Sequence, residues 1–251
     1  MTKHITFQNW DETPHLDAAA KAALLESYSP HERDARTKGI PQLGSGAIYP
    51  IPESEIVCKP FNVPAYWPRG YGMDVGWNRT AAVWGAHDRE TDVVYLYSEH
   101  YRGNAEPSIH ADAIRSRGVW MQGVIDPASR SRGQKDGEQL LVSYVDLGLR
   151  LGLADNGRET GLLEVWQRLS TGRLKVFDSL QNWLMEYRLY RRDDKGNVVK
   201  ERDHLMDATR YLVVSGIAAM QLDPAYLQRM GHKGGGVVHE YNPIGDEAFA
   251  A

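Results

Sequence analysis

Three strand-like segments follow one another between residues 71 and 103, and their order constrains the fold more than any other feature. The segments are YGMDVGWN at 71–78, TAAVWGAHD at 80–88 and DVVYLYSEHYRG at 92–103. Each is rich in Val, Tyr or Trp and ends at turn residues, as strands do. Only the short stretch DRETD joins the second segment to the third. Such short connections predict an antiparallel meander.

Segments after the meander alternate between helix and strand. Helices are predicted at 106–118, 136–153, 159–170, 180–192 and 203–220, and strands at 119–127 and 173–179. Between two of these helices, residues 189–202 carry a Lys-Gly-Asn turn signal and predict a two-stranded ribbon. A meander followed by alternating strands and helices indicates an α/β domain with a mixed sheet flanked by helices.

The two ends of the chain differ in composition from this middle part. Residues 1–68 combine a short helix at 16–28, a second short charged helix and a stretch rich in Pro and Gly, so we expect an arm or linker there. Residues 69–222 form the predicted domain. Residues 223–251 end in a Gly-rich stretch and are expected to be a tail.

Composition excludes several classes of protein. The chain has one cysteine, Cys58, which rules out an internal disulfide framework or a Cys-rich zinc site and fits a reducing cytosol. Neither a run of about 18 apolar residues nor a secretory signal is found. The net charge of −4 does not suggest nucleic-acid binding by the molecule as a whole. Basic residues are clustered, however, and their simplest interpretation is a solvated surface.

Acidic residues stand at three positions that could meet in the fold. Asp74 lies inside the first predicted strand, where an ionised side chain needs a partner. Asp126 ends the strand GVID, at the edge where α/β sheets gather ligands. Asp203, His204 and Asp207 begin the last predicted helix and can share one face of it. Converging carboxylates repel one another, and Mg²⁺ or Mn²⁺ would relieve this repulsion. Two such ions could support phosphodiester cleavage.

Each of these residues also has a simpler interpretation. Asp74 could belong to a bulge or turn, since glycines flank it, and Asp126 precedes a proline and could open a turn. Asp203 is a good helix N-cap, and Asp207 could pair with Arg210 one turn later. The ordered set of strand acid, strand-end acid and helix-start acids is a stronger signal than any member alone.

Three segments, YGMDVGWNRTAAVWGAHD, GVIDPASRSRGQKDGEQLL and RDHLMDATRYL, together resemble the nuclease domain of the large terminase subunit of tailed bacteriophages. The resemblance implies a ribonuclease H-like fold over roughly 71–220, with the 189–202 ribbon beside the catalytic groove, where it could gate DNA access. It also implies that Asp74 and Asp126 are metal ligands. The helix ligand falls within Asp203, His204 and Asp207, which all stay candidates for metal binding and catalysis.

The resemblance implies a metal-dependent endonuclease of low sequence specificity that cuts double-stranded concatemeric viral DNA during genome packaging, using two Mg²⁺ or Mn²⁺ ions. The expected location is the cytoplasm of an infected bacterial host. Expected partners are double-stranded DNA, the terminase motor domain, the small terminase subunit and the portal protein, with no membrane. The basic residues expected to hold DNA phosphates are Arg130, Arg132, Lys135, Arg191, Arg192, Lys195, Lys200 and Arg202.

One feature of a complete large terminase is missing from the sequence. No G-x-x-x-x-G-K-[ST] phosphate-binding loop is found, so we expect either an excised C-terminal fragment or a separate nuclease subunit, with the fragment favoured. Two alternatives to the packaging endonuclease remain. One is a junction resolvase or strand-transfer enzyme with the same fold. The other is a portal-docking module whose nuclease site is silent in isolation.

Overall fold

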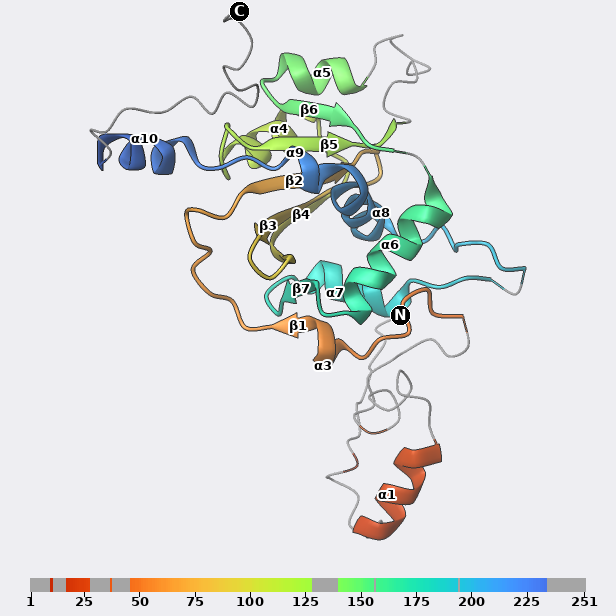
Figure 1. The fold of residues 1–251 in the computed structure, drawn as a ribbon. Coiled ribbons are helices and arrows are strands. Elements are labelled where there is room, and N and C mark those ends of the chain that lie inside the picture. Colours follow the sequence, from red (N-terminus) through yellow and green to blue (C-terminus); the bar gives the residue numbers. More distant parts are fainter. Residues whose placement is uncertain are drawn as a thin grey trace, which may run out of the picture.

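A mixed β-sheet organises the chain (Figure 1), whose computed structural model describes residues 10, 17–27, 37, 46–127, 140–155, 157–193 and 195–233. Within these ranges the sheet has seven strands in the order β1-β7-β4-β3-β2-β5-β6. The strands are β1 (Val57–Cys58), β2 (Arg69–Asp74), β3 (Thr80–Asp88), β4 (Val93–Arg102), β5 (Gln122–Ile125), β6 (Arg150–Leu153) and β7 (Leu174–Phe177).

The pairing of the strands confirms the predicted topology. Strands β2, β3 and β4 pair antiparallel and form the meander. Strands β5 and β6 add to β2 in parallel, and β7 and β1 add in parallel beyond β4. The mixed sheet is therefore a meander with parallel strands on both of its sides. Because β2 and β5 are parallel neighbours, their last residues lie at the same edge of the sheet.

Helices cover both faces of this sheet. They are α1 (Ala18–Ser27), α3 (Glu53–Ile56), α4 (Pro107–Arg115), α5 (Leu140–Asp146), α6 (Arg158–Ser170), α7 (Gln181–Leu189), α8 (His204–Tyr211), α9 (Ile217–Ala219) and α10 (Pro224–Lys233), with a π-helical turn at Leu212–Gly216. Alternate residues of β3 divide the core: Ala81 and Val83 pack with α6, α7 and α8, whereas Ala82 and Trp84 pack with α4 and α5.

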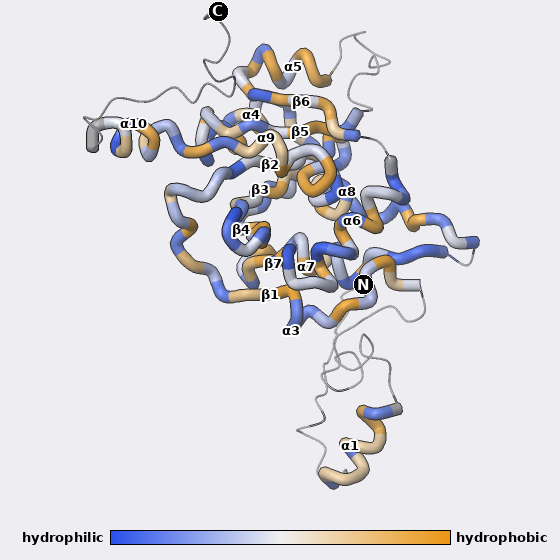
Figure 2. The backbone as a smooth tube through the Cα atoms, in the orientation of Figure 1, coloured by the Kyte–Doolittle hydropathy of each residue, from blue (hydrophilic) through white to orange (hydrophobic). Residues whose placement is uncertain are grey.

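The predicted ribbon is present as a short hairpin. Arg192 pairs antiparallel with Val198, and Gly196 adopts a φ of 82°, which a residue without a side chain tolerates best. A further bridge joins Arg191 to Ala47. The hairpin leaves the body of the molecule in Figure 1 and is mostly hydrophilic in Figure 2.

Some elements differ from the sequence prediction. Residues 150–153 form β6 rather than the end of a helix, because Gly148 adopts a φ of 85° and the chain reverses there. Within the expected arm, β1 joins the sheet, and Tyr49 and Ile56 are buried in the core. The expected tail begins with α10, and its last residues, 234–251, lie outside the described part of the chain. The second charged helix expected near residues 31–38 also falls mostly outside it.

Two of the aromatic residues expected in the core are on the surface. Trp84 and Trp183 are buried as expected, but the exposed fraction is 64% for Trp77 and 40% for Trp166. Trp77 lies in the loop between β2 and β3, beyond the last buried position of β2. Among the described residues, no helix is long and apolar enough to cross a membrane.

Candidate active site

Helix α8 packs directly on β2, and this contact creates the candidate site. Gly72, in the middle of β2, faces the helix: a Cβ atom there would lie 2.0 Å from the Ala208 carbonyl oxygen. With only a hydrogen at this position, the helix backbone approaches the strand without an intervening side chain. The first turn of α8 is thereby held against the end of β2, where Asp74 stands.

Asp74 and His204 form the contact between strand and helix. The Asp74 Oδ2 atom lies 2.8 Å from His204 Nδ1, and only 15% of the Asp74 side chain is exposed. Burial raises the pKa of Asp74, and the negative charges of Asp207 and Asp126 raise it further, while the hydrogen bond to His204 opposes them. The same hydrogen bond raises the pKa of His204. Asp74 is thus a buried carboxylate with acidic neighbours on two other elements.

Asp126 follows β5 at the same edge of the sheet. Its backbone N–H donates to the Met73 carbonyl at 3.1 Å, which fixes it beside the end of β2. The Tyr211 hydroxyl, on the last turn of α8, donates to Asp126 Oδ1 at 3.1 Å. The strand-end acid is therefore tied to both elements that carry the other candidate residues.

Two cations of the chain bind the acidic residues of α8. The Lys200 ammonium lies 2.8 Å from both Asp203 Oδ2 and Asp207 Oδ2, and the Arg210 guanidinium contacts Asp207 Oδ1 at 3.0 Å. Arg210 is 1% exposed and its stem packs on Gly161 of α6. Burial acts to raise the pKa of Asp207, but the charges of Arg210 and Lys200 hold it below its ordinary value. Asp207 therefore stays ionised.

Asp203 occupies the N-cap position of α8, but its side chain accepts no capping hydrogen bond. The cap comes from α7 instead: Glu186, which is fully buried, accepts the Leu205 backbone N–H at 2.6 Å. The Asp203 carboxylate is thus free of the capping role considered from the sequence and points to Lys200. Asp207 does pair with Arg210 within its helix, so that simpler interpretation of Asp207 holds in this arrangement.

The chemistry of these donors fits a hard divalent cation. Asp74, Asp126, Asp203 and Asp207 supply carboxylate oxygens, and their charges already attract an ammonium group from Lys200. In the part of the chain that the structure describes, however, no three His, Cys, Asp or Glu side chains are grouped closely enough to hold an ion. The reason is that Asp207 faces Lys200 and Arg210 rather than Asp74. The residues fit in kind and number, with Lys200 where a cation would be attracted.

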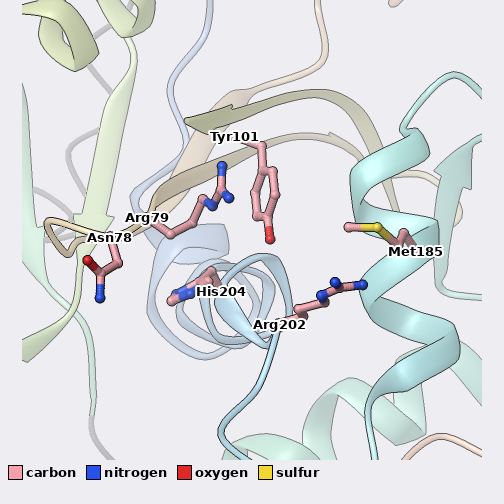
Figure 3. A pocket seen from close by; sticks show the side chains of 6 residues that line it. All are labelled: Asn78, Arg79, Tyr101, Met185, Arg202 and His204. Atoms are coloured by element: carbon pink, nitrogen blue, oxygen red, sulfur yellow. The ribbon is translucent and has the colours of Figure 1, made fainter. Parts of the chain in front are cut away.

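The predicted DNA-binding residues take several positions. Arg130, Arg132 and Lys135 lie outside the described residues. Arg192 is engaged by Glu159 at 2.6 Å, and Lys200 by the acidic pair of α8, so both are held within the protein. Arg191 pairs through its backbone with residue 47 of the arm, and Lys195 is exposed at the hairpin turn. Arg202 is exposed beside His204 and lines a pocket there (Figure 3).

Sequence reasoning missed four residues of this site: Arg79, Tyr101, Glu186 and Tyr211. Arg79 and Tyr101 lie on neighbouring strands next to His204, and Tyr211 and Glu186 hold the ends of α8. An Asn-Arg pair shortly after a strand acid was a possible signal for Arg79. Nothing in the sequence pairs Glu186 with a helix that begins 18 residues later.

A mixed sheet with a carboxylate in its first meander strand, another at the end of the adjacent parallel strand, and a late helix bringing more acids over both defines a ribonuclease H-like domain. Residues 71–215 match the terminase RNaseH-like domain family, and the chain belongs to that family.

Named relatives agree with this assignment. The large terminase subunits of Enterobacteria phage LP7 and Salmonella phage P22 are each 35% identical over 216 residues, which cover 80% of this chain but 44% and 42% of theirs. The chain thus spans less than half the length of these curated relatives. The solved nuclease domain of the P22 large terminase is 30% identical with a TM-score of 0.65, and the match covers 71% of this chain and 96% of that domain. The large terminase of a thermophilic bacteriophage, 19% identical with a TM-score of 0.60 over 82% of this chain and 55% of its own, shares the fold.

Proposed function

We propose that the chain is a metal-dependent endonuclease that cuts double-stranded concatemeric viral DNA during genome packaging with little sequence preference. The observation that carries this proposal is the packing of α8 on β2 at Gly72, which gathers Asp74, Asp126 and the acidic start of α8 at one edge of the sheet. Family membership and the 30% identity to a solved terminase nuclease domain support it. The motor domain, small subunit, portal and host cytoplasm remain proposals of the same kind.

Each residue has a proposed role. Asp74 and Asp126 would hold divalent cations, with the third ligand drawn from Asp203, His204 and Asp207. When bound, Mg²⁺ or Mn²⁺ ions would activate a water molecule and stabilise the leaving oxygen of the phosphodiester. His204, hydrogen-bonded to Asp74 through Nδ1, keeps its other ring nitrogen available to move a proton. Lys200 and Arg210 keep Asp207 ionised.

The test compares plasmid nicking in Mn²⁺ and in Mg²⁺ by the wild type and by Asp74→Asn, with Mn²⁺ binding measured by calorimetry as a second readout. Asp112→Asn is the matched control, because Asp112 is an exposed carboxylate paired with Arg115 on the helix α4. We expect Asp74→Asn to lose both nicking and Mn²⁺ affinity, and the control to keep both. Equal nicking by Asp74→Asn and the wild type would refute the assigned site.

A second candidate is favoured by one observation. Because Lys200 and Arg210 both bind Asp207, the chain's own cations neutralise a carboxylate that the nuclease needs. A portal-docking module with a silent nuclease site would have this arrangement. Wild-type protein that binds Mn²⁺ but does not nick DNA, together with Lys200→Ala protein that does, would support a site held silent by Lys200.

A further inference from the structure

A pocket opens beside the Asp74–His204 pair, on the side away from Asp207. It has a volume of about 370 Å³ and is lined by Asn78, Arg79, Tyr101, Met185, Arg202 and His204. Figure 3 shows these side chains converging from the β2–β3 loop, the end of β4, α7 and the start of α8. His204 is shared between the pocket and the proposed active site. A group bound in the pocket would therefore lie next to the catalytic carboxylates.

The pocket is positively charged and its charges are unpaired. Arg79 lies over the Tyr101 ring, with its guanidinium carbon 4.3 Å from the ring centre. Within the ranges that the structure describes, no carboxylate is within ion-pair distance of Arg79 or Arg202. Most other arginines near the site are engaged, as Arg192 is with Glu159 and Arg210 with Asp207. Two arginines without an anion, at one opening, are suited to a ligand that carries negative charge.

The one buried acid near the pocket does not neutralise these arginines. Glu186 lies behind Tyr101 and accepts a backbone N–H at the start of α8, so its charge serves the helix. Burial and the contact with Glu186 raise the pKa of Tyr101 to about 12. Tyr101 is therefore a neutral platform between Glu186 and Arg79, and the wall of the pocket stays apolar except for its cations.

The loop that carries Arg79 is held in place. The Thr80 hydroxyl donates to the Gly76 carbonyl at 3.1 Å, and the Asn104 backbone N–H donates to the Trp77 carbonyl at 2.9 Å. Gly103 packs so closely that a Cβ atom there would lie 2.0 Å from the Asn78 carbonyl oxygen. A fixed loop presents Arg79 without the entropy loss that a mobile arginine would suffer on binding.

We propose that Arg79 and Arg202 bind a backbone phosphate of the DNA strand next to the scissile phosphodiester, with Tyr101 fixing the Arg79 guanidinium. This inference rests on the proposed function and names a substrate subsite beside it. Arg79 and Arg202 are positioning residues: they hold the strand so that the adjacent phosphodiester lies at Asp74. Two arginines can bind the oxygens of one phosphate from two sides, and the apolar wall of Tyr101 and Met185 would contact the deoxyribose.

The experiment measures duplex DNA binding by fluorescence anisotropy in Ca²⁺ at several salt concentrations, for the wild type and the variants Arg79→Ala, Arg79→Lys and Arg202→Ala. A phosphate contact contributes about 0.9 to the slope of log affinity against log salt. We expect Arg79→Ala to raise Kd roughly tenfold and to lower the slope by about 1. The conservative Arg79→Lys should restore most of the slope.

Arg89→Ala is the matched control, because Arg89 is an exposed arginine at the other end of the same strand, β3. It should leave Kd and slope unchanged. An unchanged slope for Arg79→Ala, or wild-type protein that fails to bind duplex at low salt, would overturn the subsite. The plasmid assay separates this from the proposed function: protein that shows the slope change but never nicks DNA keeps the subsite and loses the nuclease. Nicking that persists with an unchanged slope does the reverse.

Discussion

The close packing of α8 on β2 predicts a large effect for Gly72→Ala. The new Cβ atom would lie 2.0 Å from the Ala208 carbonyl oxygen, 2.9 Å from the Leu212 backbone nitrogen and 3.0 Å from the Leu212 Cβ atom. None of these atoms can rotate away. Ordinary contact begins at 3.4 Å, so the helix must move from the strand by about 1.4 Å. Overpacking of this kind costs about 3 kcal/mol, at the upper end of measured values.

The expected result of this substitution follows from that movement. For a domain of about 200 residues, 3 kcal/mol corresponds to a fall in Tm of roughly 6–12 °C. Displacement of His204 and Asp207 by about 1 Å should lower the rate of DNA nicking about 100-fold at temperatures where the variant is folded. Circular dichroism melts and the plasmid assay measure the two effects.

The matched control is Gly231→Ala in α10, where an added Cβ atom meets nothing within 4 Å. It should be neutral or stabilising by up to about 1 kcal/mol, because alanine favours a helix over glycine. A Gly72→Ala protein that melts within about 2 °C of the wild type would refute the reasoning about the strand–helix contact, whatever its nuclease activity.

Two further predictions concern positions outside the proposed catalytic groups. Burial acts against the shift, but His87, Arg168 and Arg173 hold the pKa of Asp92 below its ordinary value of 3.8. Urea unfolding should therefore find Asp92→Asn less stable than the wild type above about pH 5, with the difference vanishing as the pH falls below 3.8; a constant difference would contradict this ion cluster. Glu186→Ala should lower the free energy of unfolding by about 1–3 kcal/mol, because it leaves the first amide of α8 without an acceptor, and Glu186→Gln should recover most of the loss. Equal stability of the two Glu186 variants would mean that the cap contributes nothing.

The sequence predicted the meander and the mixed sheet because their signals are local. Alternating Val, Tyr and Trp residues with a short connection define β3 and β4 without knowledge of distant contacts. Strand β6 was missed since Arg150–Leu153 continues the apolar spacing of the preceding helix, and only the positive φ of Gly148 separates the two elements. Strand β1 was missed because two residues between prolines carry no periodic signal, and its partner β7 is more than 100 residues away.

The candidate site was predicted in its identities but not in its contacts. Helical spacing places Asp203, His204 and Asp207 together, and the structure brings His204 to Asp74 and Asp207 near it. Whether these residues bind metal stays a prediction. The position of Lys200 between two carboxylates depends on how the hairpin returns to α8, which no local pattern encodes. Arg79 was missed for the same reason, since its neighbour Tyr101 belongs to the far end of another strand.

Strand β1 has a practical consequence for anyone who shortens the chain. It covers the outer edge of β7, and the segment before it buries Tyr49, Ile51 and Ile56. A truncated protein that begins at residue 69 would expose the hydrogen-bonding groups of β7 as an open edge next to uncovered apolar surface. Open edges of this kind pair with other chains and lead to aggregation. A soluble recombinant fragment should therefore start before residue 46 and keep the segment that covers this edge.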